Sequence, residues 1–117
     1  MSLIQWAFVL FVAGACGGVS LAVLVALRIR FPRWFGAAHG LLGLLALVLL
    51  FAANLLGEQQ TPALAWWALG LLAAALSGGL VFFRVLHPGR VPLPLALLHG
   101  GLALVGVYVL YRAAFPG

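Results

Sequence analysis

Four long runs of apolar residues, separated by short segments that hold most of the charge, dominate the sequence. Each run is close to the about 20 residues that a helix needs to cross the hydrocarbon layer of a membrane. The runs are continuous and do not alternate between apolar and polar residues, which favours helices over a membrane β-barrel. The pattern therefore predicts four membrane-spanning helices, covering about residues 3–27, 34–56, 63–86 and 92–112.

Composition and charge support the same conclusion. The chain has 117 residues, of which 67% are hydrophobic and 6% are charged, and a soluble domain of this size could not bury so much apolar surface. The net charge of +5 would suggest nucleic acid in a soluble protein, but most of the arginines cluster around two connections between predicted helices. The positive-inside rule explains that clustering, so we expect no nucleic-acid partner.

The arginine clusters also predict an orientation. Both arginine-rich connections fall on one side of the membrane, which positive-inside bias places in the cytoplasm. We therefore expect a multi-pass protein of a bacterial inner membrane with both termini in the periplasm. Because no linker or soluble segment interrupts the pattern, residues 1–117 are expected to form one transmembrane domain.

The two halves of the chain resemble each other at a spacing of 60 residues without gaps. Because residues of rare types match in register, we predict a tandem duplication of a two-helix hairpin, residues 1–60 and 61–117. The copies would share one orientation and be related by a pseudo-two-fold axis along the membrane normal. The expected fold is an all-α, up-down four-helix membrane bundle. The matching residues of rare types are Trp6/Trp66, Arg30/Arg90, Pro32/Pro92 and His39/His99.

Each half carries one histidine inside its second predicted span, His39 and His99. Polar side chains within a membrane are functional candidates by default. The repeat places both at one depth, and the second and fourth helices of an up-down bundle are diagonal neighbours, so both imidazoles can point to the centre. Two imidazoles that face each other suit axial ligation of a haem iron.

Small residues follow each histidine on the same helix face, and a groove of this kind could admit a flat macrocycle. Arg30 and Arg90 lie toward the same membrane side, where we expect them to pair with anionic haem propionates. The sequence therefore predicts a haem b site with the two histidines on the iron. The small residues of the expected slot are Gly43, Ala46, Ala103 and Gly106.

The same residues allow other interpretations. Histidines in a span can hydrogen-bond to a neighbouring helix or relay protons, and stripes of small residues also allow close helix packing. A zinc or copper site would lack carboxylates, and Cys16 lies too deep to complete a tetrahedron. His87, in the turn before Pro88, is interpreted as an interfacial residue, with a ligand or proton donor as the alternative.

The segments Ala38–Leu44 and Leu98–Leu104 resemble the histidine-bearing segments of small membrane b-type cytochromes. The resemblance implies a four-helix bundle with paired histidine ligands, and one haem here because only His39 and His99 lie within spans. It implies electron transfer as an oxidoreductase or electron-transfer subunit, with a redox partner or a larger membrane complex. Quinone and a second copy of the chain are further candidate partners. The alternatives are a non-enzymatic accessory or assembly subunit, or a small transporter.

Overall fold

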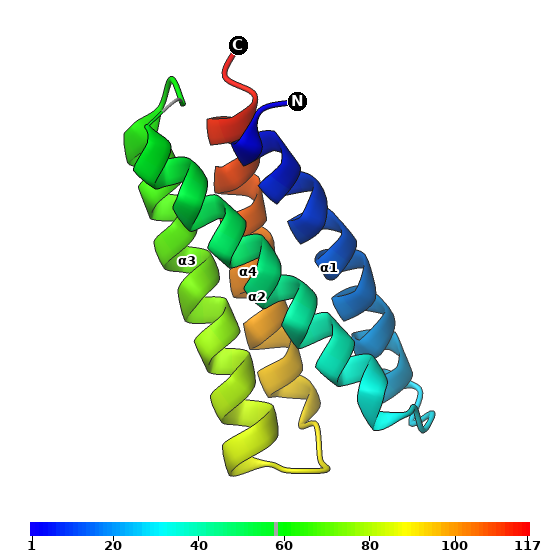
Figure 1. The fold of residues 1–117 in the computed structure, drawn as a ribbon. Coiled ribbons are helices and arrows are strands. Elements are labelled where there is room, and N and C mark those ends of the chain that lie inside the picture. The colour runs from blue at the N-terminus through cyan, green and yellow to red at the C-terminus, as the bar shows by residue number, and fades with distance from the viewer. Residues whose placement is uncertain (58) are drawn as a thin grey trace.

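The computed structural model describes residues 1–57 and 59–117, and all regular secondary structure in this part is helical (Figure 1). All four spans are long and apolar enough to cross a membrane. The prediction of four helices of membrane-spanning length is confirmed, and each expected end lies within two residues of the observed one. The helices are α1 (Leu3–Ala26), α2 (Arg33–Leu56), α3 (Pro62–Leu80), its π-helical continuation η1 (Val81–Leu86), and α4 (Leu93–Ala114).

Local sequence explains where these helices begin and end. Ser2 caps α1 in a capping box with Gln5, in which each side chain satisfies a backbone N–H group of the other residue. Pro62 occupies the first turn of α3, where its missing N–H group costs nothing. Gly57 ends α2 with a φ of 67°, a left-handed conformation that glycine adopts without steric cost.

The helices pack as a four-membered ring. α1 contacts α2 and α4, and α3 contacts the same two helices, whereas α2 and α4 share no extensive interface among the described residues. Figure 1 shows both termini at one end of the bundle, together with the connection between α2 and α3. We call this the terminal end. The opposite end holds residues 27–32 and 87–92, and we call it the arginine end.

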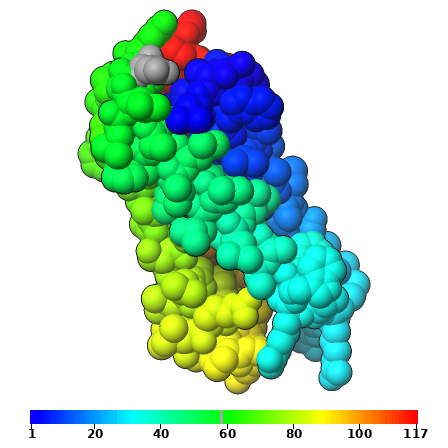
Figure 2. Space-filling view, viewed as in Figure 1, coloured from blue at the N-terminus to red at the C-terminus, as the bar shows by residue number. Residues whose placement is uncertain are grey.

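The buried core occupies the terminal half of the bundle. Every buried residue of α2 lies at or beyond Ala46, and every buried residue of α4 at or beyond Gly106. Ranges 33–45, 76–86 and 93–105 contain no buried residue. Toward the arginine end the two hairpins diverge, and Figure 2 shows a notch between their connections. One half of the bundle is therefore closely packed and the other is open.

Polar side chains reinforce the terminal end. Asn54, only 5% exposed, donates from Nδ2 to the Ala65 carbonyl over 3.1 Å, and its Oδ1 accepts from Gln59 over 3.0 Å. Gln5 donates to the Ala114 carbonyl over 3.2 Å. Because a buried hydrogen bond is costly to break in an apolar environment, these bonds fix α1 to α4 and α2 to α3 at this end.

The buried positions recur at two different spacings. In α2 and α4 they lie 60 residues apart, as Ala46/Gly106 and Leu50/Leu110 show. In α1 and α3 they lie 61 residues apart. The 60-residue spacing therefore matches the buried positions of α2 and α4, whereas those of α1 and α3 match at one residue more. The pairs in α1 and α3 are Ile4/Ala65, Ala7/Ala68, Phe11/Leu72 and Gly14/Ala75.

Candidate functional site

The two predicted histidines meet inside the bundle. His39 of α2 and His99 of α4 have ring centroids 6.2 Å apart, with an angle of 86° between the ring planes. Each is the seventh residue of its helix. Both therefore lie about 9 Å from the start of that helix, since an α-helix rises about 1.5 Å per residue. The histidines are in the open half of the bundle, on the side of the arginine end.

His99 is held by the preceding helix of its own hairpin. Its Nδ1 lies 2.8 Å from the Ala75 carbonyl oxygen. A carbonyl oxygen only accepts, so Nδ1 must carry a proton, and in the neutral ring Nε2 then carries the lone pair. The ring rests on Gly79, where a Cβ atom would stand 2.7 Å from Cε1 of His99. Phe83 completes this setting with an edge-on contact to the imidazole, at a centroid distance of 5.7 Å.

His39 is held in a similar way by α1. The ring lies over Gly18, where a Cβ atom would stand 2.9 Å from Cε1. The backbone of Gly14 lies beside the imidazole. Nδ1 of His39 is nevertheless the one buried side-chain nitrogen or oxygen in residues 1–57 and 59–117 that has no hydrogen-bond partner. Gly18 and Gly79 are 61 residues apart, the spacing that also relates the buried positions of α1 and α3.

These two glycine contacts are the part of the site that sequence reasoning missed. Both residues close a two-glycine segment, Cys16–Gly18 in the first half and Ser77–Gly79 in the second. Such segments are typical of close helix packing. The structure shows that what packs closely against each terminal glycine is an imidazole of the following helix. The sequence pattern that could have predicted these contacts is a pair of adjacent glycines followed, about 20 residues later, by a histidine.

The small residues after each histidine lie against leucines of α3. A Cβ atom on Gly43 would stand 3.6 Å from Leu76, and one on Gly106 would stand 2.8 Å from Leu72. Ala46 is fully buried in the core, and Ala103 is half-buried. These positions serve helix packing in the structure, and their role in a cofactor slot stays a prediction.

The predicted propionate partners lie in the two connections. Arg30 and Arg90 are both exposed at the arginine end. A third arginine reaches α2: Nη2 of Arg84, on η1, lies 3.8 Å from the place of a Cβ atom on Gly36. His87 is half-buried in its turn, where its N–H group donates to the Phe82 carbonyl over 3.0 Å.

The histidine pair offers two nitrogen ligands to a metal ion. The described residues contain no group of three or more metal-ligating side chains, so a metal here must take its other ligands from elsewhere, and a macrocycle supplies four. Two metal–nitrogen bonds of about 2 Å and two ring radii of about 1 Å give a centroid separation of about 6 Å. Histidines that bind metals typically donate from their other ring nitrogen to a carbonyl or carboxylate, as Nδ1 of His99 does to Ala75.

The space around the pair indicates how a macrocycle could lie. A cavity of about 170 Å³ beside His39, between α1 and α2, is lined by Trp34 and Phe35 among other apolar residues. The hairpins diverge from the histidines toward the arginine end. Toward the terminal end, Leu72 and Leu76 of α3 fill the space beside Gly106 and Gly43. Open space therefore lies on the arginine side of the histidine pair.

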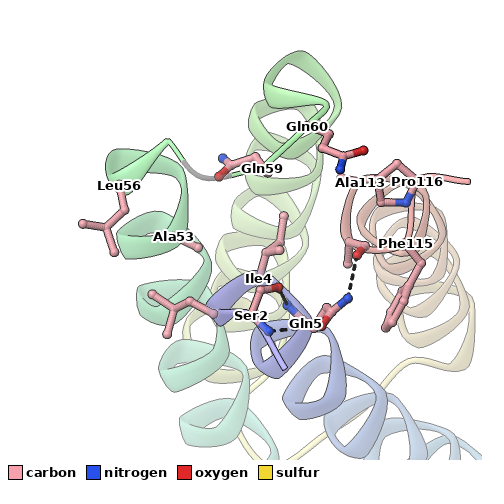
Figure 3. Close-up of a pocket in the computed structure, with 12 residues that line it drawn as sticks. Ser2, Ile4, Gln5, Ala53, Leu56, Gln59, Gln60, Ala113, Phe115 and Pro116 are labelled. Atoms are coloured by element: carbon pink, nitrogen blue, oxygen red, sulfur yellow. Dashed lines mark hydrogen bonds between the residues drawn. The ribbon is translucent and has the colours of Figure 1, made fainter.

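A larger cavity of about 460 Å³ lies at the terminal end (Figure 3). Its wall includes Ser2 and Gln5, which bond to each other and, through Gln5, to the Ala114 carbonyl. Gln59 of the same wall is bonded to Asn54. These amides serve the packing of the helix ends, and the cavity lies at the opposite end of the bundle from the start of α2 and α4. It is separate from the histidine site.

Comparison with known proteins identifies no relative: no protein-family model matches the chain, and neither a curated protein nor a solved structure matches it significantly. The function must therefore be inferred from the geometry of the site.

Proposed function

We propose that this protein binds one haem b through His39 and His99 and transfers electrons within a membrane. The observation that carries the proposal is the convergence of the two imidazoles, from diagonal helices, to a centroid separation of 6.2 Å. A pair of histidines without carboxylates or thiolates nearby is the donor set of a six-coordinate haem rather than of a closed zinc site.

The protein's own residues would hold and orient the group. Nε2 of each histidine would face the iron, and the Ala75 carbonyl would keep the His99 ring in the required tautomer and rotation. Gly18 and Gly79 let both rings sit close to the neighbouring helix. A bound haem supplies one-electron redox chemistry, and the apolar surroundings and the arginines would tune its potential. A redox partner or a larger membrane complex would exchange electrons with it.

We also propose that the bundle is an up-down fold of two tandem hairpins. The recurrence of buried positions at 61 and 60 residues, and of a histidine resting on a glycine in each half, supports a duplication. The positive-inside rule supports a bacterial inner membrane with cytoplasmic arginine-rich connections and periplasmic termini.

An absorption spectrum of protein purified from haem-replete cells tests the haem proposal. We expect a Soret band in the oxidised protein and a sharp α band after dithionite reduction. His39→Ala and His99→Ala should each lose the low-spin bands, and His87→Ala, in the turn, should keep them. A flat visible spectrum would refute haem binding. Bands that persist unchanged in both span variants would refute the assigned ligands.

A second candidate function has its own support. Leu72 and Leu76 fill the small-residue grooves of α4 and α2, and the His99 bond to Ala75 joins α4 to α3. These contacts favour an accessory subunit in which histidines and glycines hold helices together. Such a subunit would show no chromophore and would co-purify with a larger membrane complex.

A further inference from the structure

The arginine end carries positive charge that the chain itself does not balance. Five of the six arginines lie there, and all of them are exposed. The only acidic residue of the chain is Glu58, which in sequence belongs to the connection between α2 and α3. Residues 1–57 and 59–117 contain no acidic side chain that could pair with these arginines. The five residues are Arg28, Arg30, Arg33, Arg84 and Arg90.

Arg84 differs from the other four because it lies within a span rather than in or beside a connection. Its guanidinium reaches α2 at Gly36, where the absence of a side chain leaves the backbone accessible. Two turns earlier, Leu76 packs against Gly43 of the same helix. Leu76 at Gly43 and the Arg84 guanidinium at Gly36 thus bring α3 and η1 against α2 at two levels.

The π-helical segment η1 contributes to this placement. A π-helix is rare, is wider than an α-helix, and is frequent at functional sites. Within η1, Phe83 contacts the His99 ring, whereas the next residue, Arg84, reaches across to α2. Val81 and Val85 are exposed apolar side chains of the same segment. A guanidinium without an acidic partner among the described residues therefore stands beside exposed apolar side chains near the arginine end.

We propose that the junction of η1 with α2, where Arg84 meets Gly36, is a discrete binding site for an anionic phospholipid, with its phosphate on Arg84. Guanidinium groups bind phosphate through two parallel hydrogen bonds. Basic pockets between membrane helices on the arginine-rich side are known to bind such head groups. The exposed valines of η1 would lie along the acyl chains. Arg84 is exposed to the surroundings of the bundle, which favours a lipid over a group enclosed between the histidines. The inference does not depend on haem.

Native mass spectrometry of the full chain tests the site. Wild-type protein equilibrated with equal amounts of phosphatidylglycerol and phosphatidylcholine should retain one phosphatidylglycerol per chain. Arg84→Gln should bind it about fivefold more weakly, the effect expected for loss of one basic residue at a membrane surface. Arg84→Lys keeps the charge but loses the paired hydrogen bonds, so it should fall between the two. Arg112→Gln, at the terminal end, is the matched control and should retain the lipid as wild type does.

Four results would overturn the inference. The first is equal retention of both lipids by the wild type, and the second is retention in Arg84→Gln equal to that of the Arg112→Gln control. The third is full competition by inorganic phosphate alone, which would assign a free anion rather than a lipid. The fourth is an Arg84→Gln variant that keeps its lipid but loses haem absorption, which would assign the guanidinium to a propionate. Helical content measured by circular dichroism must match the wild type, and Arg84→Lys decides the question if Arg84→Gln does not fold.

Discussion

Gly79→Ala is the sharpest test of the way His99 is positioned. A Cβ atom at this position would stand 2.7 Å from Cε1 and 3.0 Å from Nδ1 of the imidazole. Distances this short cannot persist, so the ring must rotate or α4 must move away from α3. Either movement stretches the 2.8 Å bond from Nδ1 to the Ala75 carbonyl. The substitution therefore acts on the tautomer and the direction of Nε2 without removing the histidine.

The expected cost can be worked from the separate effects. Alanine in place of glycine favours a helix by about 1 kcal/mol. Forcing an extra methyl group into a packed contact costs about 1–3 kcal/mol, and a lost hydrogen bond costs about 1 kcal/mol. The net effect is a destabilisation of about 1–3 kcal/mol. Gly100→Ala is the matched control, because a Cβ atom there would meet nothing within 4 Å, so it should be neutral or slightly stabilising.

Unfolding by sodium dodecyl sulfate in mixed micelles, followed by circular dichroism, measures these changes. A double-mutant cycle with His99→Ala isolates the contact, because removal of the ring removes the clash. We expect Gly79→Ala to be neutral or stabilising in the His99→Ala background, with a coupling of about 1–3 kcal/mol. In the wild-type background it should also weaken the low-spin haem bands. A Gly79→Ala cost that is unchanged when His99 is absent would refute the reasoning.

Three further predictions concern the rest of the fold. Gly106→Ala should destabilise by about 1–3 kcal/mol in the same unfolding assay, since its Cβ atom would stand 2.8 Å from Leu72; an unchanged midpoint would contradict the observed packing. Asn54→Ala removes a buried hydrogen bond to α3 and should cost about 1–2 kcal/mol, whereas a surface change such as Leu55→Ala should cost much less. The orientation can be tested with single cysteines in a variant that lacks Cys16. A cysteine in place of Ser2 should react with a membrane-impermeant thiol reagent from the periplasmic side, and a cysteine in place of Gly89 should react only after the membrane is permeabilised. The reverse pattern would refute the proposed orientation.

The helices could be predicted from the sequence because the information is local. Membrane-length apolar runs, Pro62 in a first helical turn and Gly57 after a last one each act through their own segment of chain. The sequence also predicts that His39 and His99 lie at the same depth. In the structure six residues of α2 precede His39 and six residues of α4 precede His99, so the two are equally far from the start of their helices. These features need no knowledge of how the helices pack.

What could not be predicted depends on which helix faces which. The stripe after His99 is compatible with a macrocycle or with a neighbouring side chain, and only the structure places Leu72 against Gly106. Buried positions recur after 61 residues in α1 and α3 but after 60 residues in α2 and α4. The sequence does not reveal this difference, because apolar residues match one another by chance at many offsets. The π-helical turn has no sequence signal that distinguishes it from the α-helix before it, so the reach of Arg84 to α2 could not be foreseen.

The uneven packing of the bundle connects the two proposals. The terminal half holds the buried core and the polar bonds between helix ends. The arginine half has no buried residue in ranges 33–45, 76–86 and 93–105, yet it contains the histidine pair, the π-helical segment and the unbalanced arginines. Binding elements are drawn from the less stable parts of a structure because they must admit a ligand. A ligand that bridges the hairpins there would add the contacts that the sequence of this half does not supply, and would stabilise the bundle without disturbing the core.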